Sequence, residues 1–488
     1  MKKFLAIFLT MVMLLAILTG CGAAASGAEE QPAAGANQVA FDEEVDVLII
    51  GAGGSGMTAA IEAKTAGAEK VLVIDKQEDK LMSITYLCEG ILSGYETQLT
   101  KKLDIHFTAQ NCYDEMMEKS GYILDPKLTM ITAEQCGPLI DWLIDEVGVE
   151  FEETVDAIPF YGPNPLLHHV KGGGAGYREP FLAKLEELDV ELRMGNHATE
   201  LIGNEAHDEV IGAKVETADG VKNIKADAVI LCTGGYANST EMIQRMNPRN
   251  LCLKTNRAEG PAQGEGMIMA SEFGALLHNQ DDAKYGLSDY NGSRYSFRGT
   301  IMVGNDGRRF RDEKGHFDLS PAAMRVGMNR AGVDFIWAIE DDTAMQASES
   351  DLKALEKNEN VIVADSIEEL AAKTGIAADK LVETINNWNS YCEKGADEEF
   401  MRNPATMQKI EKAPYYALKM GAGVGMSFGG IARTEKGEVL KVNGNTIPGL
   451  YVAGEAAEAA SANGWTCSHA LTWGRIAGKN AAAYAMSK

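Results

Sequence analysis

The chain has 488 residues, 45% of them hydrophobic, so it is long enough for two or three domains with large apolar cores. Its 71 acidic and 45 basic residues give a net charge of −26, which argues against a nucleic acid or an anionic membrane surface as partner. Such a surface is compatible with a basic redox partner, and equally with plain solubility.

The first twenty residues have the pattern of an export signal. Lys2 and Lys3 precede an apolar run at 4–18, which at about fifteen residues is short for a membrane span. The run ends in Leu-Thr-Gly-Cys at 18–21 and resembles a bacterial lipoprotein signal. We therefore expect a signal peptide at 1–20, a lipid anchor at Cys21 and a flexible tether at 21–44. This arrangement predicts an extracytoplasmic protein anchored to the cell membrane.

Eight cysteines are spread along the chain, at positions 21, 88, 112, 136, 232, 252, 392 and 467. With Cys21 lipidated, an odd number remains, so at least one is unpaired. Dispersed cysteines in a large exported protein favour a reducing or anoxic setting over a disulfide scaffold. The chain has no C-x-x-C-H haem motif and no cysteine cluster with zinc spacing.

Residues 45–76 read as strand, glycine turn, helix and strand, with an acid at the end. An apolar run at 45–50 precedes Gly51, Gly53 and Gly56, which have G-x-G-x-x-G spacing. Asp75 ends the second strand. In such a fingerprint the first glycine permits the turn, the second admits the pyrophosphate and the third lets helix and strand pack. Asp75 is placed to bind an adenosine ribose. This stretch predicts a dinucleotide but leaves FAD and NAD open.

The next segments alternate between helix and strand patterns. We expect helices at 104–120, 125–147 and 178–188, and a buried strand at 228–232 that runs into Gly234 and Gly235. The pair His168-His169 has no further ligand at metal spacing, so no metal site is predicted.

The composition changes between 277 and 415, which indicates an inserted domain. It contains a predicted hairpin at 298–310, where Arg309 and Glu313 are expected to pair, and charged helices at 351–357 and 366–393. A glycine-rich stretch at 420–430, a buried strand at 449–455 and a helix at 468–486 follow.

Several of these motifs together resemble one flavoprotein family. They are the fingerprint, GYILDPKLT, GGGAG, ILCTGGYANSTEM, NDGRRFRDE and IPGLYVAGE with ALTWGRIAG. The chain is similar to the FAD-dependent fumarate reductases of the flavocytochrome c type, and to succinate dehydrogenase and 3-ketosteroid dehydrogenase flavoproteins. The resemblance implies an α/β fold: a Rossmann-like FAD-binding domain, with a central parallel sheet and an antiparallel β-meander, at 45–276 and 416–488, and an inserted α+β cap at 277–415.

The resemblance also implies non-covalent FAD and the residues that hold it. The adenosine half falls to the fingerprint and its surroundings, namely Gly51, Gly53, Gly54, Ser55, Gly56, Asp75, Lys76, Ser83 and Ala198. The ribityl chain and flavin fall to Gly90, Glu265, Glu455, His469, Ala470 and Leu471, and the turn at Gly234 and Gly235 is expected to face the same cofactor. The start of the last helix is expected to stabilise negative charge on the reduced flavin.

The substrate end departs from the family pattern. Positions at which fumarate reductases carry cationic side chains hold Phe317, Met426 and Trp465, and Phe428 lies beside them. A dicarboxylate would lose its hydration without gaining charged partners there. The sequence therefore predicts a substrate site formed by these four residues, for an apolar or aromatic compound rather than fumarate.

The implied activity is hydride transfer from FAD to an activated C=C bond of an enoate or enone, as a respiratory electron sink. Arg298 is the first candidate for the proton donor, followed by Tyr295 and His316. Electrons are expected from an external FMN or haem protein. Two alternatives remain: a 3-ketosteroid-type dehydrogenase or reductase, and a flavin-binding lipoprotein that transfers electrons without turnover.

Overall fold

The computed structural model describes residues 39–157, 166–246, 262–278, 283–291, 293, 295, 297, 299–314, 320–462 and 464–488. The elements below all belong to the second of the chain's two units, Ala40–Lys488, which is compact. The predicted signal peptide and all but the last residues of the predicted tether lie outside the described residues. Within the described residues, no helix has the length and apolar character needed to cross a bilayer.

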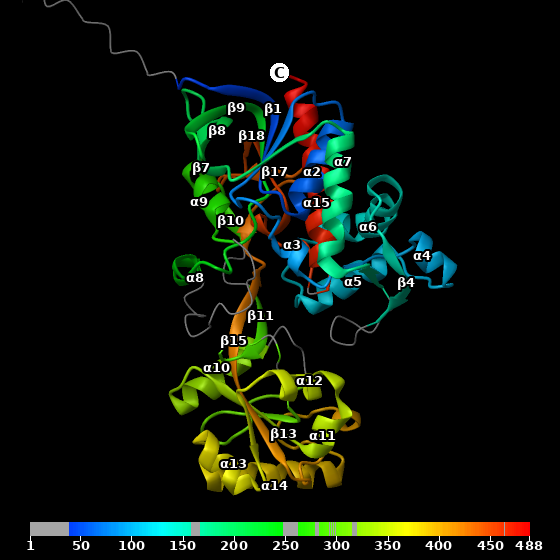
Figure 1. Ribbon diagram of the computed structural model, residues 1–488, viewed down its shortest axis with the longest axis vertical. Helices are drawn as coiled ribbons and strands as arrows, with labels where there is room; N and C mark the ends of the chain where they lie inside the picture. The colour runs from blue at the N-terminus through cyan, green and yellow to red at the C-terminus, as the bar shows by residue number, and fades with distance from the viewer. Residues whose placement is uncertain are drawn as a thin grey trace, which may run out of the picture. The chain divides into compact units, whose positions relative to one another are not determined.

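A central sheet organises the second unit (Figure 1). Its main path is β17 (Glu438–Leu440), β18 (Thr446–Val452), β9 (Gly220–Leu231), β1 (Glu43–Ile50), β2 (Val71–Asp75) and β6 (Glu191–Met194). From β18 to β6 the neighbours are parallel, whereas β7 (His197–Gly203), β8 (Val210–Thr217) and β9 pair antiparallel. The predicted α/β class, with a parallel sheet and a meander, is confirmed. It follows from apolar strands such as β1, in which Val47, Leu48 and Ile49 are fully buried.

Two helices with small residues lie side by side against this sheet (Figure 1). They are α2 (Gly54–Thr65) and α15 (Thr466–Ala485). A Cβ on Gly474 would lie 2.1 Å from Thr58 Oγ1, and one on Gly478 would lie 2.2 Å from the Ala59 carbonyl oxygen. Thr58 Oγ1 also donates to the Leu471 carbonyl at 3.1 Å. These contacts hold the first half of α2 against the middle of α15.

A helical layer follows β2. It comprises α3 (Ile84–Leu87), α4 (Gln98–Lys102), α5 (Ala109–Lys119), α6 (Pro126–Trp142), the π-helix η1 (Leu143–Val147), the 3₁₀ helix η2 (Gly173–Tyr177) and α7 (Arg178–Glu187). The predicted helix at 104–120 begins only at Ala109, because Thr108 Oγ1 caps it by accepting from Asn111 N. The helix predicted from 125 does begin with an Asp125 cap and Pro126, but it continues as a π-helix after Trp142.

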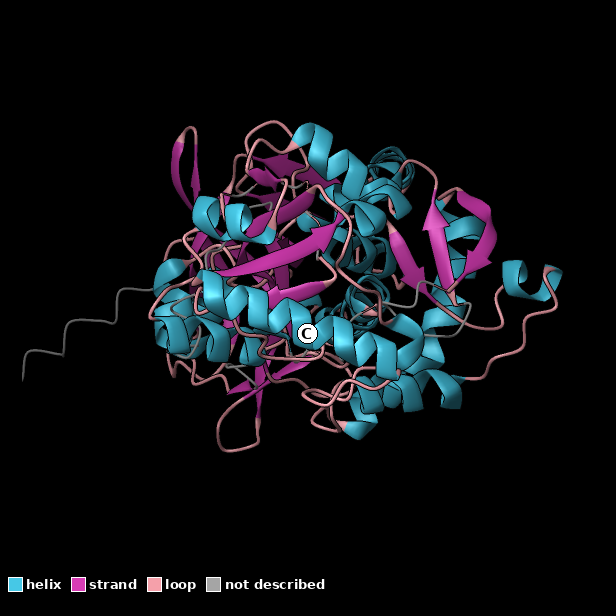
Figure 2. Ribbon diagram, turned by 90° about the horizontal axis from the view of Figure 1, so that it is seen from below, coloured by secondary structure: helices cyan, strands magenta, loops and turns pink. Residues whose placement is uncertain are grey.

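A small sheet belongs to the same layer, in the order β3 (Ile91–Ser93), β5 (Leu167–Val170), β4 (Phe151–Asp156). In Figure 2 this sheet and α4 lie to one side of the other strands. The buried His168 bonds to Thr97 Oγ1 at 2.8 Å and to the Leu166 carbonyl at 2.9 Å, so it is a core residue. The described part of the chain holds no cluster of three or more metal-ligating side chains.

Residues 283–427 build a five-stranded antiparallel sheet with its own core. Its path is β11 (Ala283–Asp289), β15 (Tyr415–Ser427), β13 (Ile336–Asp341) and β12 (Ile301–Val303), and β14 (Val361–Ala364) also pairs with β15. Its helices are α10 (Ser320–Ala331), α11 (Asp342–Ala347), α12 (Glu349–Lys357), α13 (Ile367–Thr374) and α14 (Ala378–Lys394), with the 3₁₀ helix η5 (Pro404–Thr406). The single helix predicted at 366–393 is therefore two, because Gly375 ends α13 at a φ of 75°.

The boundaries predicted for the cap, 277 and 415, stay a prediction. The strand β15 begins at the second boundary and continues through most of the glycine-rich stretch that was expected to open the next part. The remaining elements are α8 (Thr240–Met246), α9 (Glu265–Glu272), β10 (Leu277–His278) paired with β16 (Gly430–Ile431), and the 3₁₀ helix η6 (Gly454–Ala456).

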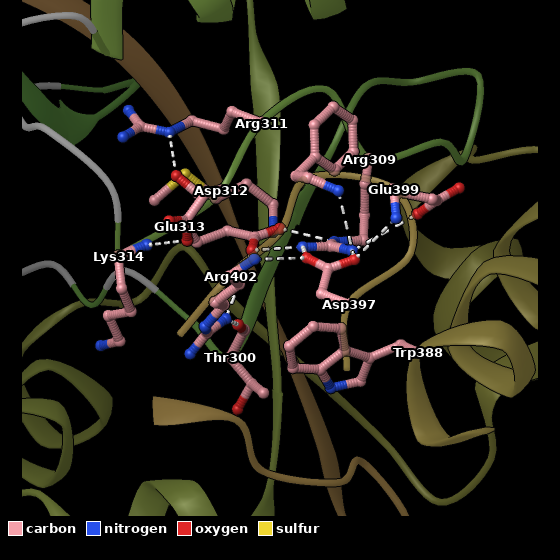
Figure 3. A network of polar contacts seen from close by, with 12 residues as sticks. Thr300, Arg309, Arg311, Asp312, Glu313, Lys314, Trp388, Asp397, Glu399 and Arg402 are labelled. Carbon is pink, nitrogen blue, oxygen red and sulfur yellow. Dashed lines mark hydrogen bonds and ion pairs between the residues drawn. The ribbon is translucent and has the colours of Figure 1, made fainter. Parts of the chain in front are cut away.

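A buried ion network stabilises the five-stranded sheet (Figure 3). Arg309 Nη2 lies 2.8 Å from Glu313 Oε2 and 2.9 Å from Asp397 Oδ2, so the predicted pairing of Arg309 with Glu313 is confirmed. Arg402 Nη1 donates to the Thr300 carbonyl at 2.7 Å, and the guanidinium of Arg309 stacks over Trp388 at 4.6 Å. Full hydrogen bonding compensates for the burial of these charges.

Candidate functional site

A cavity of about 850 Å³ lies at the carboxyl ends of β1, β2 and β9. Its wall also includes the start of α9, the end of β15 and the first turn of α15. The carboxyl edge of a parallel sheet is where α/β proteins bind their ligands, and the size is that of a ligand site. Fifteen of the predicted cofactor residues line it: Gly51, Gly53, Gly54, Ser55, Asp75, Lys76, Ser83, Gly90, Ala198, Gly234, Glu265, Glu455, His469, Ala470 and Leu471.

The fingerprint turn can only be built with glycine at two positions. Gly51 has a φ of 111°, and a Cβ there would lie 2.2 Å from the Cys232 carbonyl oxygen. A Cβ on Gly56 would lie 1.9 Å from the Gly51 oxygen, so Gly56 acts through packing and does not line the cavity. Gly53 is the N-cap of α2 and has no side-chain cap, which leaves this helix start suited to a phosphate.

The residues after β2 form one end of the cavity. Asp75 accepts from the backbone N of Ala52 at 2.8 Å and of Gln77 at 2.9 Å, which fixes its carboxylate. Glu265, which was predicted to touch the ribityl chain or flavin, lines the cavity, and its carboxylate meets Lys76 Nζ at 2.6 Å and His197 Nε2 at 3.2 Å. These contacts arise because Glu265 is the first residue of α9 and Lys76 directly follows β2. His197 was not predicted.

Glu455 lies in the middle of the wall, where the 3₁₀ helix η6 follows β18. Its Oε1 accepts from the backbone N of Ser427 at 2.8 Å, and burial raises the pKa of this carboxyl to about 7. A Cβ on Gly235 would lie 2.4 Å from that oxygen. Gly235 therefore admits Glu455 and does not itself line the cavity.

Three buried hydroxyl groups on the wall test whether a polar ligand fits. Within the described residues, the side-chain oxygens of Ser83, Thr233 and Ser461 have no hydrogen-bond partner. Buried hydroxyls are rarely left without partners in native proteins. A ligand rich in phosphate and hydroxyl oxygens would satisfy them, so these residues fit a dinucleotide.

The first turn of α15 forms the other end. The predicted residues Ala470 and Leu471 lie in this turn. His469 is buried against Arg433, a residue that the sequence analysis did not single out. Arg433 follows β16 with no local motif around it, and it meets His469 only in the folded chain.

Two of the four predicted substrate residues, Met426 and Phe428, line the cavity. Trp465 does not, and its prediction is wrong: it is 1% exposed and packs with Cys112, Cys136, Leu166 and Ala462 in a separate core. The helix phase explains this, because Trp465 is the N-cap of α15 and turns away from the residues that follow. Phe317 lies outside the described residues.

Of the proton-donor candidates, Arg298 and His316 lie outside the described residues. Tyr295 is described and does not line the cavity. Its carbonyl accepts from Asn358 Nδ2 at 2.7 Å, and Lys353 Nζ lies 5.9 Å from its ring centroid. Tyr295 is therefore held by neighbours within the five-stranded part, and its role as proton donor stays a prediction.

Comparison with known proteins identifies the ligand. Residues 46–469 match the model of a family described as an FAD binding domain. The chain is 29% identical to a fumarate reductase (cytochrome) of Shewanella frigidimarina over 91% of this chain and 78% of that protein. It is 27% identical to a vinyl phenol reductase of Lactiplantibacillus plantarum over 91% of this chain and 98% of that protein.

Solved structures agree with the fold. The open conformation of a flavocytochrome c3 fumarate reductase superposes with a TM-score of 0.76 at 26% identity, over 91% of this chain and 79% of that one. A 3-ketosteroid Δ1-dehydrogenase from Sterolibacterium denitrificans has a TM-score of 0.75 at 18% identity, over 91% of this chain and 100% of that one. This likeness supports only the fold. The chain therefore belongs to the family of FAD binding domains, binds FAD, and is an FAD-dependent oxidoreductase of the class that acts on CH–CH bonds.

Proposed function

We propose that the enzyme uses FAD to reduce a C=C bond conjugated to a carbonyl or carboxylate in an apolar or aromatic compound. One observation carries the choice of substrate class. Among the described residues that line the cavity, Lys76 is the only lysine or arginine, and Glu265 neutralises it 2.6 Å away. The α15 end offers Met426 and Phe428 instead. A dicarboxylate such as fumarate would be desolvated there without charged partners.

The residues of the chain position the substrate and polarise it, whereas FAD supplies the hydride chemistry when bound. Met426 and Phe428 exclude water and hold an apolar substrate. The first turn of α15 is the positive end of a 20-residue helix, so it stabilises negative charge that develops beside Ala470 and Leu471. Arg298 remains our first choice for the proton donor, because Tyr295 is held away from the cavity wall.

We also propose that the protein is located outside the cytoplasm. Lys2, Lys3 and the apolar run before Cys21 support a lipid-anchored protein, and an external FMN or haem protein would deliver its electrons. Fractionation tests the anchor: Cys21→Ala should move the protein from the membrane to the soluble fraction. A variant that stays with the membrane contradicts lipid anchoring.

A substrate panel tests the reaction. The holoenzyme is reduced anaerobically with one equivalent of dithionite and mixed with fumarate, cinnamates, vinyl phenols and cyclic enones, and flavin absorbance is followed. We expect fast reoxidation by an aromatic enoate or a vinyl phenol and slow reoxidation by fumarate. Fumarate as the best oxidant contradicts the proposed substrate class. Reoxidation by none of them favours a carrier without turnover, and flavin reduction by a saturated 3-ketosteroid favours the dehydrogenase direction.

A further inference from the structure

Two cysteines that are distant in sequence meet on the wall of the FAD cavity. Cys88 follows α3, and Cys467 is the second residue of α15. Their Sγ atoms lie 3.8 Å apart, and both residues are half-buried and line the cavity. The proposed reduction uses neither sulfur. A partly exposed thiol pair beside a redox cofactor is a site with chemistry of its own.

The surroundings of Cys88 favour its thiolate. The hydrogen bond with Cys467 is the main cause that lowers the pKa of Cys88 to about 7; burial opposes this, and the backbone N–H of Gly90, 3.4 Å from the sulfur, adds to it. A lowered pKa favours the thiolate, which is the nucleophilic form of cysteine. The start of α15 adds the positive end of a helix dipole next to the pair.

We propose that Cys88 and Cys467 form a redox-active dithiol that hydrogen peroxide converts into a disulfide within the cavity. The Cys88 thiolate attacks the peroxide oxygen, the O–O bond breaks, and with one proton the products are a Cys88 sulfenic acid and water. The Cys467 sulfur then attacks the Cys88 sulfur, the S–O bond breaks, and the departing hydroxide takes the Cys467 proton as a second water. Two thiols are thus oxidised by two electrons, and one molecule of hydrogen peroxide is reduced.

The fold allows Cys88 and Cys467 to approach closely enough for a disulfide bond. A disulfide bond needs the sulfurs roughly 2 Å closer than they are. Cys88 lies in the turn between α3 and β3, a segment that can shift more readily than α15. The bond would tie this turn to the first turn of α15 and so alter the wall that Gly90, His469 and Leu471 share.

The test maps disulfides in the holoenzyme and needs no alkene, so its outcome is independent of the proposed reduction. The protein is prepared anaerobically, treated with a small excess of hydrogen peroxide, alkylated with N-ethylmaleimide, digested without reductant and analysed by mass spectrometry. We expect a linked peptide pair containing Cys88 and Cys467, which disappears after dithiothreitol. The flavin absorbance spectrum should shift and recover in parallel.

Controls come from the same chain. Cys112 and Cys136 are fully buried away from the cavity, so both should be recovered alkylated after denaturation. Cys392→Ser, on α14, should form the linked pair as the unmodified protein does, whereas Cys88→Ser and Cys467→Ser should not. Two results overturn the proposal: Cys88 and Cys467 both remain thiols, or Cys88 reaches the sulfinic acid while Cys467 stays reduced. The unmodified protein alone decides this if a serine variant fails to bind FAD.

Discussion

Arg433 Nη2 donates a hydrogen bond to His469 Nε2 over 2.8 Å, and both residues are buried. An arginine cannot accept, so the imidazole is held as the neutral tautomer that carries its proton on Nδ1. Burial and the Arg433 charge keep the pKa of His469 well below its ordinary value. Arg433 is itself fixed by the Glu458 carbonyl at 2.8 Å and by the Trp473 ring at 4.0 Å. The FAD cavity is therefore lined by a neutral histidine whose proton is on Nδ1.

Replacing Arg433 should release this histidine. In Arg433→Met, the pKa of His469 should rise because the cation is gone, although burial still opposes protonation. Nitrogen NMR on histidine-labelled protein should show mixed tautomers instead of one, and the flavin midpoint potential should change. His469→Gln keeps a neutral donor and serves as control: its potential should stay nearer that of the unmodified enzyme. An unchanged tautomer in Arg433→Met contradicts the role of the arginine.

Stability should depend on pH through Glu455. Its folded pKa of about 7 lies above the ordinary 4.5, so the stabilisation it gives is complete below about 4.5 and is lost as pH rises through 7. Glu455→Gln removes this dependence. Both proteins are unfolded with urea at pH 5 and at pH 7.5. The difference between their unfolding free energies should change by about 2 kcal/mol between these two pH values. Equal differences at both pH values would exclude a raised pKa.

The ion network of the five-stranded sheet gives a stability prediction. Arg309→Ala leaves Glu313 and Asp397 buried without their main partner, which should cost about 3–5 kcal/mol in chemical unfolding. Arg330→Ala breaks a partly exposed pair with Asp306 at 3.2 Å and the hydrogen bonds to the Arg308 and Arg309 carbonyls at 3.1 Å, and should cost less than Arg309→Ala. Equal costs for the two variants would contradict the account of the buried network.

The apolar end of the cavity should control substrate choice. Phe428→Ala removes apolar contact, so kcat/KM for an aromatic enoate should fall roughly 10- to 200-fold. Met426→Arg should raise the ratio of kcat/KM for fumarate to that for cinnamate, because it adds a cation beside the proposed substrate position. Met401→Ala, at a side chain 88% exposed, is the neutral control. Unchanged preference in both cavity variants would place the substrate elsewhere.

Features set by neighbouring residues could be predicted from the sequence. The fingerprint turn depends on glycines within a few residues of one another, and the Asp125 cap with Pro126 marks a helix start by itself. The sequence also carried the signal that divides 366–393, because Gly375 is a helix terminator.

Features set by tertiary contacts could not be predicted from the sequence. Glu265 meets Lys76 across 189 positions of sequence, and no local pattern encodes that pair. The prediction for Trp465 failed because a shared position in an aligned motif does not fix which way a helix cap faces. Arg433 and His469 likewise meet only because β16 and α15 pack at the same end of the cavity.

The glycine contacts between α2 and α15 have a consequence for how variants are interpreted. A methyl group on Gly478 would collide with the Ala59 carbonyl two turns beyond the cavity, and the helices would have to separate. The two helix starts would then diverge, and the cavity residues on α2 and α15 would no longer fit one ligand. A variant of this protein that loses the colour of bound FAD can therefore have lost the spacing between α2 and α15 rather than a direct contact with the cofactor.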